Sequence, residues 1–326
     1  MFDCYQRTIN YLRVSVTDRC NFRCMYCMPS QGVQLLDHSD ILSYEEFIRL
    51  LEVFSRQGIQ KIRLTGGEPL VRKGLTDFIR NIAAIEAIND ISLTTNGCLL
   101  APMAEQLKNA GLNRVNISLD TVDAKKFRRI TRGGDVADTL RGVAAALEVG
   151  LTPVKLNTVL TELLTMADLE YFVDLVQRHP VNVRFIEYMP IGECRVGAGP
   201  SVEEVKTMLE QLGHGLLTPV SAPTGNGPAR YYQLPGAKGT LGFVTPISEH
   251  FCSQCNRVRL TADGKLKPCL LSDQEIDLKA ALRSGASEER LVELFQQTVA
   301  AKPEGHSLTP QQGKSEVRRR MSQIGG

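Results

Sequence analysis

The stretch Cys20-Asn21-Phe22-Arg23-Cys24-Met25-Tyr26-Cys27 decides how this chain is interpreted. Its three thiols have the spacing C-x3-C-x2-C and follow a strand-like segment at residues 12–17. A typical iron–sulfur cluster takes four cysteine ligands, so three would leave one iron open for chemistry. The spacing therefore favours a reactive cluster. A zinc site with a fourth ligand from elsewhere, or three unrelated buried thiols, are the alternatives.

With Tyr26 before its last cysteine, this motif resembles the signature of the radical S-adenosylmethionine enzymes. The resemblance implies that the three thiolates hold a 4Fe–4S cluster, whose open iron binds S-adenosylmethionine and yields a 5′-deoxyadenosyl radical. The run Thr65-Gly66-Gly67-Glu68-Pro69 follows a strand-like segment. A Gly-Gly pair by itself more often marks an ordinary turn. Beside the cysteine motif it resembles the family segment that holds the methionyl amino group.

A second set of cysteines lies far downstream, as Cys252, Cys255 and Cys269. Its spacing is C-x2-C-x13-C, and His250 could supply a fourth ligand. By spacing alone, zinc and an iron–sulfur cluster fit this set about equally well.

Two three-cysteine motifs in this order, the run F-C-x2-C-N-R-x-R and the final Gly325-Gly326 resemble the molybdenum cofactor biosynthesis protein A family, the GTP 3′,8-cyclases. The resemblance covers nearly the whole chain. It implies that the enzyme cyclises GTP in the first step of molybdenum cofactor biosynthesis. It also implies that Cys252, Cys255 and Cys269 bind a second 4Fe–4S cluster, whose open iron anchors the guanine ring.

Further site residues are carried over from the matching motifs. The S-adenosylmethionine contacts would be Tyr26, Gly67, Ser118 and Met189. The GTP contacts would be Arg13, Arg63, Thr94, Lys155, Arg257, Val258 and Arg259. The Gly325-Gly326 end would reach the active site and support turnover, although Gln323 departs from the aromatic or basic residue that the family often has there.

Strand-like and helix-like segments alternate from residue 12 to about 189, which predicts an α/β fold with a parallel sheet. Ser43 and Glu46 make a capping-box pattern at the start of one helix. The resemblance implies a partial (βα)6 barrel, followed by a C-terminal domain that carries the second cluster. We expect a core at 1–212, the C-terminal domain at 213–301 and a flexible tail at 302–326. The expected strands are 12–17, 61–65, 91–95, 114–119, 153–160 and 182–187.

These strands carry polar residues two positions apart, which places them on one face of the sheet. Arg13, Arg63, Lys155 and Arg184 are the cations among them. Buried parallel strands are normally apolar throughout, and a dry core does not hold four unpaired cations. Edge or solvent-facing strands are the alternative for any one of them. Taken together, the six strands predict a polar cavity that binds an anion such as a triphosphate.

The bulk composition narrows the class of protein. A formal net charge of +2 over 326 residues argues against a general nucleic-acid or membrane-surface binder. Of the nine cysteines, an odd number, six stand in two sets at metal spacings, which suits a reducing compartment. No apolar run approaches a membrane span, so we expect a cytoplasmic protein. The resemblance implies a flavodoxin- or ferredoxin-type electron donor and a downstream cyclic pyranopterin monophosphate synthase, and it allows a homodimer. A peptide-modifying radical enzyme and a non-enzymatic zinc-binding module are the rival classes.

Overall fold

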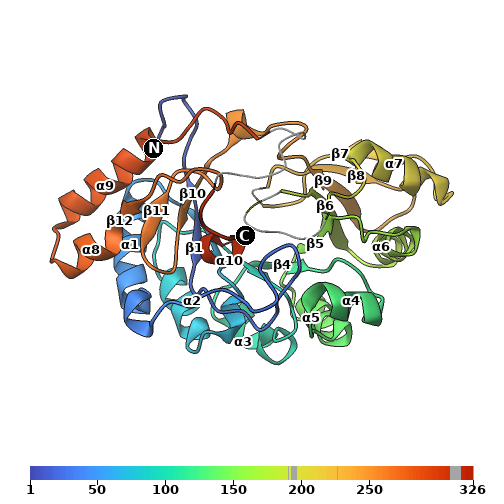
Figure 1. Cartoon of the computed structure of the whole chain (residues 1–326), viewed down its shortest axis with the longest axis horizontal. Coiled ribbons are helices and arrows are strands. Elements are labelled where there is room, and N and C mark those ends of the chain that lie inside the picture. The colour runs from blue at the N-terminus through green and yellow to red at the C-terminus, as the bar shows by residue number, and fades with distance from the viewer. Residues whose placement is uncertain (190, 192–196, 226, 309–316, 326) are drawn as a thin grey trace.

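The computed structural model describes residues 1–326 except 190, 192–196, 226, 309–316 and 326. In these described residues, twelve strands form one sheet in the order β12-β11-β10-β1-β2-β3-β4-β5-β6-β9-β8-β7. Figure 1 shows the strands curving around the middle of the molecule, with the helices on the outside. The α/β fold that the alternation predicted is confirmed.

Six adjacent parallel strands form the centre of the sheet. They are β1 (Tyr11–Ser15), β2 (Lys61–Thr65), β3 (Asp90–Thr95), β4 (Arg114–Ser118), β5 (Val154–Leu160) and β6 (Val181–Glu187). Each lies within two residues of its expected bounds, because apolar and polar residues alternate clearly along these segments.

The downstream part of the chain adds strands to both sides of this centre. β9 (Thr240–Val244) pairs with β6, and β10 (Arg257–Leu260) pairs with β1, both in parallel. The sheet therefore continues across the predicted domain boundary at residue 212.

Antiparallel strands complete the two edges of the sheet. They are β7 (Thr218–Val220), β8 (Arg230–Gln233), β11 (Lys265–Lys267) and β12 (Ile276–Asp277). Asp263-Gly264 lies in the turn between β10 and β11, with Gly264 at φ 77°. Residues 213–228 are rich in Gly and Pro, as loops often are, yet Pro219 lies in the edge strand β7, where its missing N–H costs no ladder bond.

Helices cover the outer face of the sheet (Figure 1). They are α1 (Tyr44–Arg56), α2 (Leu75–Ala83), α3 (Ala104–Asn109), α4 (Ala124–Thr131), α5 (Val136–Glu148), α6 (Met166–Arg178), α7 (Val202–Gln211), α8 (Leu278–Arg283) and α9 (Glu288–Ala300), whereas the short helix α10 (Met321–Ile324) lies on the other face. The capping box of α1 is confirmed, since the side chains of Ser43 and Glu46 each bond the other residue's backbone N–H. Apolar strand residues such as Leu12, Ile62 and Val183 pack beneath the helices in one continuous core.

The opposite face of the sheet points to the centre of the molecule. The C-terminal helix α10 lies there, beside β1 and β10 (Figure 1). Ile324 joins Ile191 and Val317 in a small apolar cluster, against which Met189 packs. The last described residues thus have a defined seat inside the curve of the sheet.

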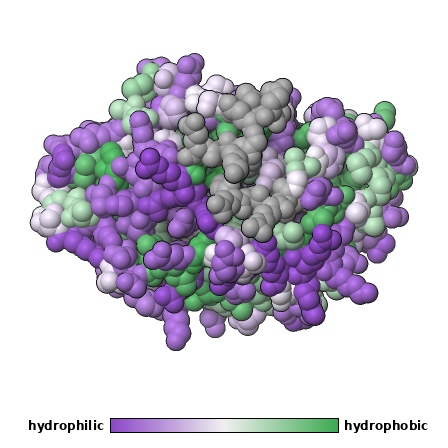
Figure 2. Space-filling model, in the orientation of Figure 1, coloured by the Kyte–Doolittle hydropathy of each residue, from purple (hydrophilic) through white to green (hydrophobic). Residues whose placement is uncertain are grey.

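Among the described residues, no helix combines the length and apolar character needed to span a bilayer. On the face drawn in Figure 2, hydrophilic residues occupy most of the described surface and hydrophobic ones show in small patches.

Candidate functional site

The first cysteine set begins in the loop that follows β1. This loop runs beside the Gly-Gly loop that follows β2, because Ser15 and Thr65 are in register at the ends of the two strands. Gly67 N–H donates to Thr17 O at 2.8 Å, and Glu68 N–H donates to Arg19 O at 2.8 Å. A Cβ on Gly67 would lie 2.3 Å from Arg19 O, so only glycine fits. The paired glycines hold the chain that leads into Cys20.

The three thiols of this set are free and lie close enough to affect one another. Cys27 N–H donates to Cys24 O at 2.9 Å, which closes a tight turn. Burial raises the pKa of Cys24, and the nearby Cys27 and Cys20 raise it further. Burial also raises the pKa of Cys20 to about 11. These thiols become thiolates only beside a cation, so the set fits a metal cluster that replaces their protons.

Glu68 of the Gly-Gly loop lies next to this set and is buried. Its carboxylate accepts bonds from the N–H of Leu70 at 3.0 Å, the N–H of Asn96 at 2.7 Å and the hydroxyl of Thr95 at 2.7 Å. Burial raises its pKa to about 7 despite these bonds. Glu68 therefore joins the loops after β2 and β3 at the edge of the cysteine set.

Tyr26 is fixed by the loop that follows β4. Its hydroxyl donates to Asp120 Oδ2 at 2.8 Å, and Asp120 Oδ1 accepts from Val159 N–H at 2.9 Å. Burial raises the pKa of Asp120 to about 6. Ser118 is the last residue of β4, two positions before Asp120, and is partly exposed. The structure thus brings these two predicted S-adenosylmethionine contacts to the same ends of the strands as the cysteines.

The predicted cations do share the inner face of the sheet. Strand pairing sets Arg259 beside Arg13, and Arg13 beside Arg63. The same face continues through Asn116 to Lys155. Burial lowers the pKa of Lys155 to about 7, with further contributions from Arg184, Arg114 and Arg63. Buried cations this close together repel one another, which is the electrostatic signature of an anion-binding cavity.

Several of these cations already have neutral partners. Arg63 Nε donates to Ser92 Oγ at 3.2 Å, and Lys155 Nζ donates to Thr224 O at 3.0 Å. Arg184 donates to Asn157 Oδ1 and to Asn116 Oδ1, at 2.6 and 2.7 Å from Nη2. Carbonyls and amides orient these groups without neutralising them, so the positive charge stays available to a ligand.

Thr94 and Val258 complete the placement of the predicted GTP contacts. Thr94 lies opposite Asn116, and its buried Oγ1 has no hydrogen-bond partner among the described residues. An unpaired buried hydroxyl is costly, so it fits a site that a ligand completes. The Val258 side chain is fully buried in the outer core, which leaves only its backbone for a ligand.

The second cysteine set lies at the start of β10. Cys252 opens the 3₁₀ helix η4 (Cys252–Gln254), Cys255 follows it and Cys269 follows β11. Burial alone would raise the pKa of Cys255, but Arg257 and Lys302 lie beside the thiol and bring the pKa down to about 7. Cys269 and Cys255 each raise the pKa of Cys252 after burial does, so the three thiols are neighbours. Three neighbouring thiols with cations beside them fit a metal cluster.

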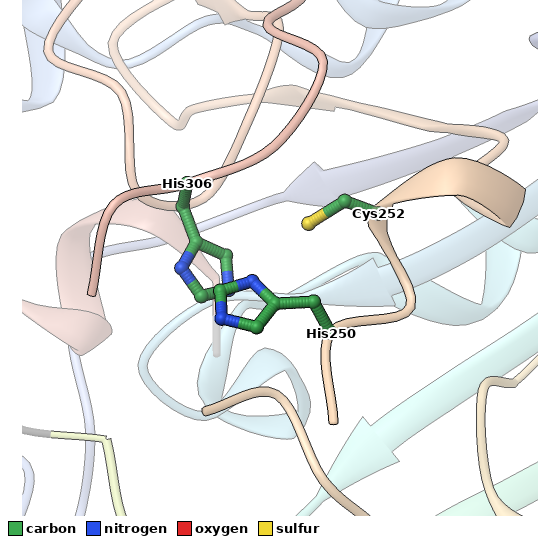
Figure 3. Close-up of side chains that lie close together, drawn as sticks. All are labelled: His250, Cys252 and His306. Atoms are coloured by element: carbon green, nitrogen blue, oxygen red, sulfur yellow. The ribbon is translucent and has the colours of Figure 1, made fainter. Parts of the chain in front are cut away.

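Two histidines also lie beside Cys252. Ligand atoms of His250, Cys252 and His306 are all within 4.8 Å of one another. The two imidazole centroids are 4.2 Å apart with the rings tilted by 30°, and Figure 3 shows both rings next to the sulfur. His306 Nε2 is 2.8 Å from Pro246 O. Because a carbonyl oxygen only accepts, Nε2 carries the proton. Cys252 therefore belongs to two potential ligand sets, one of cysteines and one with histidines.

The end of the chain contacts one of the inward-facing cations. Gly325 O accepts from Arg259 Nη1 at 2.5 Å. Arg319 holds the preceding segment, since it donates to both carboxylate oxygens of Asp263 and of Glu275. Gly326 lies outside the described residues.

Comparison with known proteins agrees with this arrangement. The family model of the radical SAM superfamily matches residues 14–176, and the model of Molybdenum Cofactor Synthesis C matches residues 181–308. A GTP 3′,8-cyclase of Desulforamulus reducens is 52% identical over 329 residues, covering 100% of both chains. Those of Pelotomaculum thermopropionicum and Moorella thermoacetica are each 49% identical over 100% of both chains.

The chain belongs to the GTP 3′,8-cyclase family. Membership in its radical SAM superfamily implies a 4Fe–4S cluster and S-adenosylmethionine. Among solved structures, Streptococcus suis SuiB bound to S-adenosylmethionine matches with a TM-score of 0.61 at 13% identity, over 85% of this chain and 65% of that chain. That likeness shows the fold alone.

Sequence reasoning missed several residues of this cyclase-family site. Arg114 lies on the inner face and pairs with Asp90 through both carboxylate oxygens. Arg7, Lys302 and His306 come from segments with no metal motif, yet they surround the second cysteine set. Arg114 could have been found, because it lies two positions before Asn116 and so shares its face of β4.

Proposed function

We propose that this chain catalyses the radical S-adenosylmethionine-dependent cyclisation of GTP to (8S)-3′,8-cyclo-7,8-dihydroguanosine 5′-triphosphate, the first step of molybdenum cofactor biosynthesis. The observation that carries the proposal is a row of cations on the inner face of one sheet, with one cysteine set after the end of β1 and the other before the start of β10. Full-length relatives named GTP 3′,8-cyclase support it.

Cys20, Cys24 and Cys27 hold the first 4Fe–4S cluster in this proposal. When bound, the cluster and S-adenosylmethionine supply a 5′-deoxyadenosyl radical. Gly67 presents its backbone at the cysteine loop, where any side chain would clash with Arg19 O. Tyr26, Ser118 and Met189 orient the S-adenosylmethionine.

GTP lies across the cation row. Charge-assisted hydrogen bonds from guanidinium and ammonium groups suit the three phosphates. Thr94 Oγ1 and the backbone of Val258 add neutral contacts. The residues assigned to GTP are Arg13, Arg63, Thr94, Lys155, Arg257, Val258 and Arg259. A rigid sheet that fixes both ends of the substrate supplies the positional selectivity that a free radical lacks.

Cys252, Cys255 and Cys269 hold a second 4Fe–4S cluster in this proposal, which faces the guanine end of GTP. The lowered pKa of Cys255 supports a thiolate at this position. The contact between Gly325 and Arg259 supports a role of the Gly325-Gly326 end in turnover.

The proposed reaction determines which partner proteins the enzyme needs. Reductive cleavage of S-adenosylmethionine needs a low-potential electron donor of the flavodoxin or ferredoxin type, and a cyclic pyranopterin monophosphate synthase consumes the product. Free thiols among the described cysteines suit the reducing cytoplasm. We retain a homodimer as part of the proposal.

Anaerobic reconstitution followed by product analysis tests the proposal. The protein is incubated with dithionite, S-adenosylmethionine and each nucleoside triphosphate in turn. We expect a brown protein with about seven to eight irons per chain and a cyclised product from GTP only. A colourless, zinc-loaded protein after careful reconstitution would contradict the radical mechanism.

A further inference from the structure

Lys302 lies just after α9, in a segment whose composition gives no sign of a metal site. Its side chain is nevertheless buried, with only 3% of the residue exposed. Burying an ammonium group costs free energy unless its charge is balanced and its N–H groups are hydrogen-bonded. The groups that contact the Lys302 side chain therefore indicate which kind of ligand this site binds.

Two of those partners are backbone carbonyls on different segments. Lys302 Nζ donates to Arg257 O at 2.8 Å and to Pro268 O at 2.9 Å. Arg257 is two residues after Cys255, and Pro268 immediately precedes Cys269. One ammonium thus ties together the two chain segments that bring these cysteines to the site.

The thiols of Cys255 and Cys269 also lie beside this ammonium. Their charges raise the pKa of Lys302 against the lowering by burial. The two carbonyls take two of the three ammonium protons, which leaves one to face a sulfur.

Arg7 fixes the backbone that carries Lys302. Its Nη2 donates to Pro303 O at 2.7 Å, and its Nη1 donates to Glu304 O at 2.9 Å and to Cys252 O at 2.8 Å. Asp3 orients the guanidinium through an ion pair at 2.6 Å. This network fixes the backbone next to Lys302 against the backbone of Cys252.

We propose that Lys302 is the positioning residue of the second cysteine site: its ammonium joins the Cys255 and Cys269 segments and balances the negative charge of their thiolates in the bound cluster. This inference rests on the proposed function. A cluster held by three thiolates is anionic and becomes more so on reduction. A fixed cation beside it stabilises the reduced form and strengthens the hold on iron.

Lys302→Met tests the proposal, because methionine keeps much of the volume and removes the charge and all three donors. Lys108→Met is the matched control, since Lys108 also bonds a backbone carbonyl, Gly150 O at 2.9 Å, but lies on α3 at the surface. Both are placed in the full-length chain with Cys24→Ala, which leaves the second site as the cluster site to be measured. The readouts are iron loss to a chelator and the reduction midpoint potential.

We expect Lys302→Met to lose iron to the chelator about 10 to 100 times faster than the Lys108→Met control, as outer-shell partners of metal ligands typically behave. The midpoint potential should become more negative, and Lys302→Arg should restore part of that shift. A chain with intact Cys24 and Cys255→Ala reports on the first site, where Lys302→Met should change neither quantity.

An unchanged iron-loss rate and potential in Lys302→Met would overturn the proposal. So would an equal loss of iron at both sites, or an unfolded chain that Lys302→Arg fails to restore, because each indicates a general structural role. Absence of iron from the second site when Lys302 is intact would instead contradict the proposed function, so the two failures are distinguishable.

Discussion

Replacing Gly325 by alanine should unseat the C-terminal tail without disturbing the fold. Gly325 ends α10 at φ 74°, a conformation that L residues rarely adopt. An added Cβ would lie 2.5 Å from Thr65 Cγ2 and 3.4 Å from Ser15 Cβ. Both neighbours are buried on central strands of the sheet, so the tail must move instead of them.

The size of the effect follows from two contributions. The left-handed conformation costs an L residue about 1–2 kcal/mol. Displacement breaks the bond from Arg259 to Gly325 O, and a hydrogen bond to a charged group is worth about 1.5–3 kcal/mol. Together these lower the ratio of seated to unseated tail by about 60- to 4,000-fold. If turnover needs the seated tail, cyclised product should fall at least ~10-fold.

The assay compares product per cluster, iron content and GTP affinity between Gly325→Ala and Gly285→Ala. Gly285 has φ 80° and nothing within 4 Å of an added Cβ, so this control introduces the same backbone strain without the clash. Deleting Gly325 and Gly326 should reproduce the loss of product while clusters and GTP affinity stay nearly intact. Equal product formation by Gly325→Ala and Gly285→Ala would show that turnover does not need the tail in its position against Ser15 and Thr65.

Five other substitutions separate the parts of the site. Cys24→Ala should abolish all cleavage of S-adenosylmethionine. Cys255→Ala should spare that cleavage and abolish conversion of GTP. If Cys255→Ala formed cyclised product at a rate comparable to the unchanged protein, the proposed role of the second cluster in anchoring guanine would be wrong. Arg63→Ala should weaken GTP binding about 10- to 150-fold and guanosine binding little, because the lost contacts are to phosphate; equal weakening of both ligands would indicate collapse of the site. The pKa of Lys155 is about 7 in the free chain, against an ordinary value of 10.5. Because a bound triphosphate favours the charged amine, GTP binding at pH 8 should take up a proton, and GTP affinity should fall as pH rises. Calorimetry in buffers of different ionisation enthalpy measures this proton uptake, which Lys155→Met should remove. His306→Ala should leave the iron content of the second site unchanged, and loss of that metal would favour the histidine-containing ligand set over the three cysteines.

The same pKa of Lys155 has a consequence for stability. The charged amine is disfavoured in the folded chain, so the unfolded chain binds more protons between about pH 7 and 10.5. The contribution of Lys155 to the free energy of unfolding therefore rises with pH across this window.

Local patterns of the sequence were enough to predict the centre of the fold. The six parallel strands alternate in polarity, and Ser43 with Glu46 marks the start of α1, so periodicity and capping predicted both. The inward cations were predicted by the same alternation, because residues two apart share a face.

Pairing between distant segments could not be predicted in this way. Nothing local to β9 or β10 indicates that they join opposite sides of the central strands. Lys302 and Arg7 likewise reach the second cysteine set only through tertiary packing, from segments near the two ends of the chain. Such contacts depend on the overall path of the chain and not on a motif.

The most direct test of the account is the fate of one hydrogen atom of GTP. GTP deuterated at the ribose 3′ carbon is incubated anaerobically with the reconstituted protein, dithionite and S-adenosylmethionine, and the 5′-deoxyadenosine formed is weighed by mass spectrometry. We predict one deuterium in the 5′-deoxyadenosine and a cyclised isomer of GTP in matching amount. Unlabelled 5′-deoxyadenosine formed together with unchanged GTP would contradict the assignment of this cavity to GTP cyclisation.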